Sequence, residues 1–168
     1  MVILACLMTS CFPDTPSQTT PQISLISPLV NPQFVGDTIV GAKDTLYGHY
    51  DEELGISYLD TMSLGDTLLI HSYYTSNMNN LVSITSTYDT LALDLWFGLD
   101  PEKESVKKAL AAGSDPQKGI LYFNPMYSLV SFPIYIVPQK TGSFPIKLTV
   151  TSDSKFPTNF VLFTLPVK

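Results

Sequence analysis

The sequence contains no arginine, and all nine of its cationic residues are lysine. The guanidinium group of arginine is the usual reader of phosphate and guanine, and the net charge of −6 repels polyanions, so we expect no nucleic-acid partner. The same acidic balance argues against electrostatic docking on anionic lipid. Charged residues make up only 14% of the chain and hydrophobic residues 45%, which excludes a disordered chain.

Long apolar runs are also missing. The opening run from Val2 to Met8 is much shorter than the roughly 20 residues that a membrane-crossing helix needs. It leads into "CFPDTPSQTTPQ", which is polar and broken by prolines, so a first core strand is the weaker alternative. We interpret residues 1–10 as a secretory signal segment and residues 11–33 as a proline-rich, semi-extended tether.

Cysteine is scarce, with Cys6 and Cys11 as the two examples. The segment "LMTSC" resembles the lipobox of bacterial lipoproteins, with Thr9 and Ser10 as the small residues before Cys11, although no lysine or arginine precedes the apolar run. The resemblance implies cleavage before Cys11, lipidation of its thiol and anchoring in the cell envelope, as an outer-membrane lipoprotein facing the periplasm or the cell surface. Cys6 would leave with the signal, so the mature chain could form no internal disulfide.

The remaining segment, residues 34–168, is predicted to be one mainly β domain, because nine tyrosines and nine phenylalanines favour sheet. Alternation is strict in "LALDLWF", which places Leu91, Leu93, Leu95 and Phe97 on the buried face and Ala92, Asp94 and Trp96 on the other. "SFPIKLTVTS" alternates in the same way, with Phe144, Ile146, Leu148 and Val150 inward. The run from Thr67 to Tyr74 and the following "NNLVSITST" suggest a hairpin.

Two further expectations concern the positions of strands in the sheets. Pro133 and Pro145 interrupt predicted strands, and because proline lacks a ladder donor we place both at sheet edges or bulges. The apolar "ISLISPLV" inside the tether is an alternative early edge strand, which would move the domain boundary toward Gln22.

One segment has a helical pattern. In "LDPEKESVKKALAAGSDP", Asp100 is a candidate N-cap, Pro101 takes the first helical position and Gly113 ends the helix, which predicts a short surface helix over residues 101–112. Val106, Ala109 and Leu110 fall on one face, and Glu104 and Lys108 are spaced to pair.

Short alternating strands and one inserted helix favour a two-layer antiparallel β-sandwich with immunoglobulin-like topology. The stretch "KTGSFPIKLTV" resembles the corner and penultimate strand of bacterial immunoglobulin-like and PKD-like domains, with Phe144 where tyrosine is usual. The whole layout is similar to surface lipoproteins of Bacteroidetes. That resemblance implies glycan capture or adhesion as the type of function.

Catalytic motifs are absent, so we predict no catalytic residues, no metal and no cofactor. His49 with Asp51, Glu52 and Glu53 is either a metal site or, as we favour, a solvated acidic turn. His71 is expected to face solvent or a partly covered rim.

Trp96 beside Asp94 is the candidate binding site, because an exposed indole next to a carboxylate can stack on a sugar ring and accept its hydrogen bonds. The alternative is that the helix covers Trp96. We therefore predict a non-catalytic, lipid-anchored module that binds glycan or a surface protein. The alternatives are a carboxylate-dependent polysaccharide hydrolase or accessory subunit, and an architectural subunit that assembles edge to edge.

Overall fold

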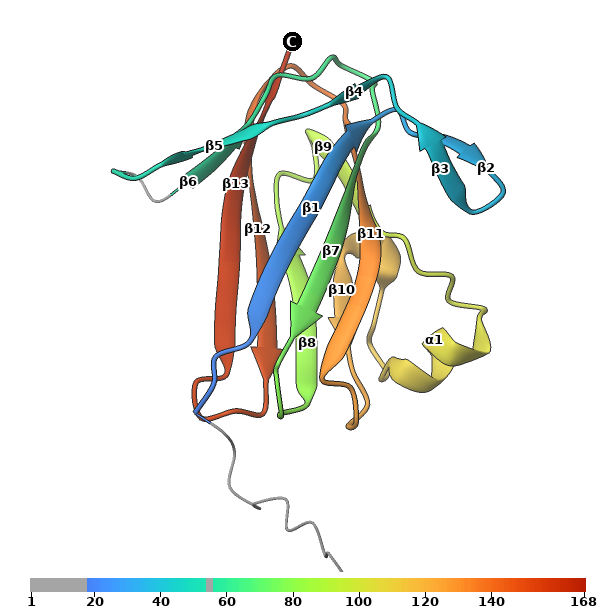
Figure 1. Cartoon of the computed structure of the whole chain (residues 1–168), viewed down its shortest axis with the longest axis vertical. Helices are drawn as coiled ribbons and strands as arrows, with labels where there is room; N and C mark the ends of the chain where they lie inside the picture. Colours follow the sequence, from blue (N-terminus) through green and yellow to red (C-terminus); the bar gives the residue numbers. More distant parts are fainter. Residues whose placement is uncertain (1–17, 54–55) are drawn as a thin grey trace, which may run out of the picture.

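A computed structural model describes residues 18–53 and 56–168, and it is a two-layer β-sandwich with one short helix (Figure 1). The first sheet has five strands. In spatial order they are β4 (Asp44–Thr45), β1 (Gln22–Val30), β7 (Leu68–Thr75), β11 (Leu129–Pro138) and β9 (Leu93–Phe97). All pairs within it are antiparallel.

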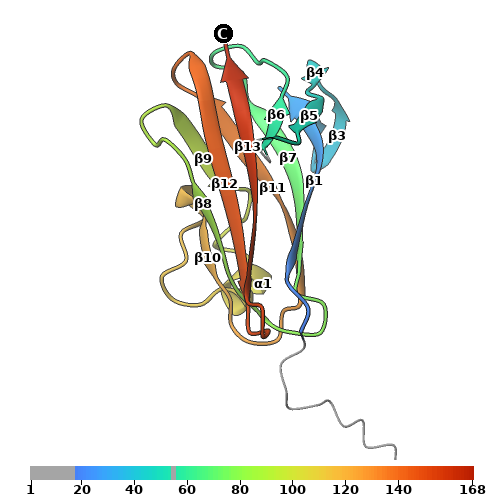
Figure 2. The ribbon, with the colours of Figure 1, turned by 90° about the vertical axis from the view of Figure 1, so that its left-hand side faces the viewer.

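The second sheet has six strands. In spatial order they are β10 (Ile120–Tyr122), β8 (Leu81–Thr87), β12 (Gly142–Ser152), β13 (Thr158–Val167), β6 (Ile56–Leu59) and β5 (Gly48–Asp51). Its pairs are antiparallel except that β6 runs parallel to β13. The two sheets face each other across the core (Figure 2), so the predicted mainly β sandwich is confirmed.

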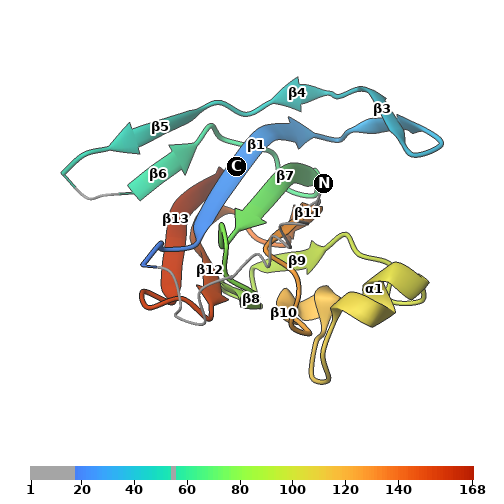
Figure 3. The ribbon, with the colours of Figure 1, turned by 60° about the horizontal axis from the view of Figure 1, so that its bottom comes forward.

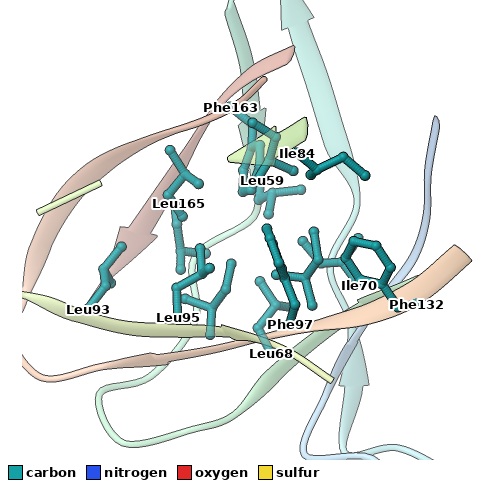
Figure 4. Close-up of a cluster of buried hydrophobic side chains, with 14 of the residues drawn as sticks. Leu59, Leu68, Ile70, Ile84, Leu93, Leu95, Phe97, Phe132, Phe163 and Leu165 are labelled. Carbon is teal, nitrogen blue, oxygen red and sulfur yellow. The ribbon is translucent and has the colours of Figure 1, made fainter. Parts of the chain in front are cut away.

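The core is formed by the inward-facing residues of both sheets (Figure 4). In β12 Ile146, Leu148 and Val150 are each 0% exposed, as the alternation predicted, because successive strand residues point to opposite faces. The predicted hairpin is wrong: β7 belongs to the first sheet and β8 to the second, so the chain between them crosses from layer to layer.

The sandwich begins earlier than residue 34. Strand β1 starts at Gln22 and pairs with β7 from Gln22↔Thr75 to Val30↔Leu68. The predicted boundary at residue 34 is therefore wrong, since residues 22–30 belong to the sheet and not to the tether, and the alternative boundary near Gln22 holds. The predicted signal segment, Cys11 and the first part of the tether lie outside the described residues.

A strap crosses one end of the sandwich (Figures 1 and 3). We define it as residues 33–53, which contain the two-stranded ribbon of β2 (Gln33–Val35) and β3 (Thr38–Gly41), then β4 and β5. Asp66 fixes the strap to the sandwich, because its carboxylate lies 2.7 Å from the ammonium of Lys43 and accepts a hydrogen bond of 2.8 Å from Asn31 Nδ2. Asn31 Oδ1 in turn accepts a 2.7 Å bond from the N–H of Thr67.

The helix is shorter than predicted. Helix α1 spans Glu104–Ala109, and its N-cap is Lys103 rather than Asp100. Asp100 Oδ1 instead accepts a 2.9 Å bond from the N–H of Glu102, which closes a turn before the helix starts.

The side chains of the helix follow the predicted pattern only in part. The predicted pairing of Glu104 with Lys108 is not the one formed, since Lys107 lies 2.9 Å from Glu102 and 4.0 Å from Glu104. Val106, Ala109 and Leu110 face inward as predicted and line a cavity of about 250 Å³ with residues that include Phe123 and Phe132. Among the described residues, no helix combines the length and the apolar character needed to cross a bilayer.

Both prolines lie in interior strands, at places where a neighbouring strand is missing. The carbonyl of Pro133 accepts a 2.7 Å bond from the N–H of Gly98, so its nitrogen faces the side on which β9 has just ended at Phe97. Pro145 pairs with Thr164 of β13, while β8 reaches β12 only from Lys147 onward. The expectation of an edge position therefore holds locally for each proline and not for the whole strand.

Candidate functional site

The predicted site lies on β9, the last strand of the first sheet. Leu93, Leu95 and Phe97 are buried, so Asp94 and Trp96 share the opposite face as the alternation requires. The pattern fails at its start, because residues 90–92 form a turn and not strand. There Leu91 is 76% exposed and Ala92 is 1% exposed, the reverse of the prediction.

Trp96 stacks on a tyrosine of the next strand. Its ring lies 5.2 Å from that of Tyr135 with an interplanar angle of 9°, and the two residues are directly opposite each other in the β9–β11 ladder. The alternative that α1 covers Trp96 is wrong. The helical element next to β9 is the 3-10 turn η1 (Pro116–Lys118), while α1 lines the separate cavity near Phe123. Trp96 is half-buried in this arrangement.

Gly98 makes room for the tyrosine ring. A Cβ atom at position 98 would stand 2.6 Å from Tyr135 Cε2 and 2.7 Å from Pro133 Cγ, closer than Cβ atoms come in folded proteins. Because glycine has no Cβ, the ring of Tyr135 can lie over the end of β9 and meet Trp96 there. The aromatic pair therefore depends on a residue two positions after the tryptophan.

A groove runs along the open edge of β9. We call it the β9 groove; it has a volume of about 590 Å³ and is lined by Tyr88, Thr90, Leu93, Asp94, Leu95, Trp96, Gln117 and Lys118. Asp94 is exposed and accepts a 2.8 Å hydrogen bond from Gln139 Nε2. The lining of the groove thus includes one indole, the carboxylate of Asp94, the amide of Gln117 and the ammonium group of Lys118.

Two neighbours of β9 are held in place by their own contacts. The hydroxyl of Tyr88 donates a 3.2 Å bond to the carbonyl of Leu95, and burial together with the negative charges of Asp94 and Asp115 raises the pKa of Tyr88, so it stays protonated. Lys118 lies 2.9 Å from Asp115. This contact raises the pKa of Lys118 and lowers the pKa of Asp115.

The backbone of η1 is fixed against β8. Gly119 ends the turn with φ of +65°, and its carbonyl accepts a 2.9 Å bond from the N–H of Ser86. Because the turn is held in this way, Gln117 and Lys118 stand at the groove on a defined backbone.

The arrangement is suited to binding a polar ring. The indole of Trp96 offers apolar contact, and the carboxylate of Asp94 on the same face of β9 offers a hydrogen-bond acceptor. Sequence reasoning found Trp96 and Asp94 but missed Tyr135, Tyr88 and Gln139. Tyr135 shares a face with Pro133 and Val137 by alternation, yet only the register of β9 on β11 shows that it meets Trp96.

The other candidates do not converge. His49 stacks on Tyr58 with ring centroids 5.3 Å apart, and Asp51 accepts a 3.0 Å bond from the N–H of Glu53. Within residues 18–53 and 56–168 no group of three or more His, Cys, Asp or Glu side chains could hold a metal ion. His71 is half-buried on the outer face of β7, in line with the partly covered rim that we expected. Cys11 lies outside the described residues.

Comparison with known proteins gives no family. No protein-family model matches the chain, and no curated protein matches it. Among solved structures, a family 123 glycoside hydrolase from Clostridium perfringens is 17% identical with a TM-score of 0.40, over 89% of this chain and 27% of that one. A PapD-like domain of human CEP192 is 12% identical with a TM-score of 0.37, over 82% of this chain and 98% of that one. The chain spans about a quarter of the hydrolase chain, and similarity at this level carries no inference about ligand or activity.

Proposed function

We propose that this protein is a non-catalytic binding module, anchored in the cell envelope through a lipid on Cys11, and that the β9 groove binds a glycan. The observation that supports the glycan site is the stacked pair of Trp96 and Tyr135 with the Asp94–Gln139 hydrogen bond beside it. The apolar face of a sugar ring packs on an indole, while its hydroxyl groups can donate to a carboxylate and accept from an amide or ammonium group.

The side chains of Asp94 and Trp96 are already oriented before a ligand binds. The bond from Gln139 fixes the orientation of Asp94 before any ligand arrives, so less side-chain entropy is lost on binding. The half-buried Trp96 leans on Tyr135 and cannot turn freely. Rigid aromatic anchors of this type contribute most of the affinity in many interfaces.

The proposed anchor rests on the resemblance of "LMTSC" to a lipobox. The sandwich begins at Gln22, which leaves about ten residues after Cys11, or at most roughly 35 Å of extended chain, as a tether. An outer-membrane lipoprotein similar to those of Bacteroidetes would hold the sandwich close to the membrane in this way. Metabolic labelling with a palmitate analogue tests the anchor: we expect label in the wild type and none in Cys11→Ala, and equal label in both contradicts it.

A glycan array probed with the full-length protein in lipid nanodiscs tests the binding site. We expect the strongest glycan to lose at least about tenfold in affinity with Trp96→Ala, since removal of a central tryptophan typically costs more than 1 kcal/mol. The control is Tyr73→Ala, which removes an aromatic ring 43% exposed on β7 of the same sheet but outside the β9 groove. Equal loss in both variants, or no glycan bound, contradicts the site.

The same reagents separate binding from hydrolysis. A polysaccharide hydrolase would release reducing ends from a polymer panel and would lose this activity with Asp94→Asn. We expect no release by the wild type above the level of Asp94→Asn. Turnover that depends on Asp94 would overturn the non-catalytic proposal and favour the hydrolase alternative.

A further inference from the structure

The side of the sandwich opposite the β9 groove carries another cavity. It lies between β1 of the first sheet and β13 of the second, has a volume of about 570 Å³, and we call it the edge slot. Its lining includes the apolar side chains of Ile23, Leu25, Leu59, Ile70, Val161 and Phe163. Among residues 18–53 and 56–168 no charged side chain lines it, and the strap residues Thr45 to Gly48 form part of its wall. Near its lower end Asn159 Nδ2 donates a 2.9 Å bond to the carbonyl of Pro21.

Both walls of the edge slot end in strand edges that are incompletely paired. On the side of β1 away from β7, strand β4 pairs only with Leu29 and Val30, so within the described residues no strand pairs with Gln22–Ser27 there. On β13 the neighbour β6 pairs only with Phe163 and Thr164, and in the part of the chain that the structure describes no strand pairs with Thr158–Leu162 on that side. Alternate backbone N–H and C=O groups of both stretches are therefore available for hydrogen bonds.

We propose that the edge slot binds an extended peptide segment of a partner protein, which adds as a further strand beside β1. Backbone groups of Gln22–Ser27 would pair with the peptide, and every second side chain of the peptide would enter the apolar space between the sheets. The open edge covers six residues, or about 20 Å, so the segment needs about six residues with apolar side chains at alternate positions.

The chemistry of the slot favours a peptide over other occupants. An anionic lipid or fatty acid needs a cationic or free amide group at the mouth to hold its headgroup. The lining that the structure describes contains no charged side chain, and the nearby amide of Asn159 already donates to the carbonyl of Pro21. A strand edge offers a repeating row of donors and acceptors, which only another strand can satisfy along its length. Ile23 and Leu25 remain half-buried against the core, so a peptide side chain would cover their remaining apolar surface.

The negative charge around the edge slot indicates which residues should flank the apolar part of the peptide. The strap holds five acidic residues and only Lys43, which leaves a net charge of −4 out of −6 for the whole chain. Asp60, just past the strap, accepts a 3.2 Å bond from the N–H of Tyr47, one of the lining residues. We therefore infer lysine or arginine on either side of the apolar stretch, where opposite charge speeds and orients the encounter.

The experiment uses the full-length protein in lipid nanodiscs and the fluorescent peptide Lys-Val-Thr-Val-Thr-Val-Thr-Lys. Fluorescence anisotropy measures binding, and hydrogen exchange with mass spectrometry locates it. We expect saturable binding that weakens with salt, and slower exchange in residues 22–27 when peptide is present. Two control peptides are an isomer that groups the valines together and a version with N-methyl groups on alternate residues, both expected to bind at least about tenfold more weakly.

Variants of the protein test the slot itself. Leu25→Lys puts a charge into the apolar space and should lower peptide affinity at least about tenfold, whereas Ser24→Lys, on the outer face of the same strand, should not. Val161→Trp fills the slot without adding charge and should have the same effect as Leu25→Lys, which keeps the test valid if Leu25→Lys does not fold. Trp96→Ala should leave peptide binding unchanged, so this result is independent of the glycan site.

Other outcomes overturn the proposal. Equal binding by the N-methylated peptide would show that the backbone edge is not used. Binding of a neutral lipid such as monoolein with no binding of the peptide would assign the slot to an acyl chain. Slow exchange, without peptide, of those amides of residues 22–27 that point away from β7 would show that the chain itself or a second copy already covers the edge. Wild-type affinity in both Leu25→Lys and Val161→Trp would place the peptide elsewhere.

Discussion

Tyr74 is the residue whose burial is least compensated. Its side chain is 0% exposed and its ring stacks on Phe132 at 5.2 Å, but its hydroxyl has no hydrogen-bond partner among the described residues. Burial raises the pKa of Tyr74 far above its usual range, an effect that the nearby Ser72 offsets in part. The Ser72 hydroxyl donates its proton to the carbonyl of Phe132 at 2.7 Å, so it has no second proton to donate to the tyrosine oxygen.

Removing this hydroxyl should stabilise the protein. We expect Tyr74→Phe to raise the free energy of unfolding by up to about 2 kcal/mol, because an unsatisfied buried hydroxyl costs about 1–3 kcal/mol. Urea unfolding followed by circular dichroism measures it. Tyr88→Phe is the control, since it removes the bond to the Leu95 carbonyl and should lower stability by about 1 kcal/mol. A loss of stability in Tyr74→Phe equal to that in Tyr88→Phe contradicts the prediction.

Gly98 controls the stacking of Tyr135 on Trp96, which is the aromatic residue of the pair that lines the β9 groove. In Gly98→Ala the new methyl group would meet the ring of Tyr135, so the ring must move away from Trp96. Trp96 is the single tryptophan of the chain, and its fluorescence spectrum therefore reports this change directly. We expect a shifted emission maximum and weaker glycan binding, while Gly41→Ala, whose Cβ would meet its nearest atom at 3.6 Å, should change neither. An unchanged spectrum in Gly98→Ala would show that the ring can adjust without leaving Trp96.

At the scale of elements, the strap consists of short and largely exposed strands. Its strands are two to four residues long, and several of its side chains are more than half exposed, among them Val35, Val40, Tyr47 and Tyr50. The contact of Lys43 with Asp66 ties it to the turn before β7. The side chain of Asp66 is only 14% exposed, so this contact is better shielded from water than the surface ion pairs of the helix.

Loss of Asp66 should release the strap. The hydrogen bond and charge of Lys43, with the Asn31 hydrogen bond, lower the pKa of Asp66 below its ordinary 3.8. Its contribution to stability is therefore present above pH 3.8 and is lost as the pH falls through the lowered pKa. We expect Asp66→Ala to speed hydrogen exchange in residues 33–45 at neutral pH, with global stability reduced by no more than about 1 kcal/mol. Asp37→Ala, which removes an exposed carboxylate of the strap, should leave exchange unchanged, and equal rates in both variants contradict the prediction.

At the scale of the whole molecule, local pattern and long-range pairing contribute differently to what the sequence can predict. The alternation in β12 predicted its buried residues, because a period of two depends only on the strand itself. The sheet to which a strand belongs is not local, and β7 and β8 were wrongly joined for this reason. Asp100 and Pro101 had the residue types of a helix start, yet the side chain of Asp100 closed a turn with Glu102.

The candidate site shows the same difference between what local alternation predicts and what depends on long-range pairing. Trp96 and Asp94 were found because their parity on one strand is visible in the sequence. Tyr135 lies 39 positions away and Gln139 lies 45 positions from Asp94, so their contacts depend on the register between β9 and β11. No spacing within one strand contains that information.

Phe97 is a fully buried aromatic residue of the core, and its truncation should be costly. Phe97 is 0% exposed, and its ring lies 4.9 Å from that of Phe132 on the adjacent strand. We expect Phe97→Ala to lower the free energy of unfolding by about 3–5 kcal/mol, because the cavity cannot collapse in a packed core. Tyr50→Ala, which removes a ring that is 62% exposed, should cost less than about 1 kcal/mol. Denaturant unfolding compares the two, and a similar small cost for both would show that the interior around Phe97 repacks.

The chain enters the sandwich at one end and leaves it at the other. This arrangement determines which parts of an anchored protein would lie farthest from the membrane. Strand β1 starts at one end of the long axis, and β13 brings the chain to the other, beside the strap (Figure 1). β12 alone, with 11 residues, measures about 35 Å. A body held from the side of Gln22 would therefore stand upright with the acidic strap at its far end, and the β9 groove and the edge slot would lie along its two opposite sides.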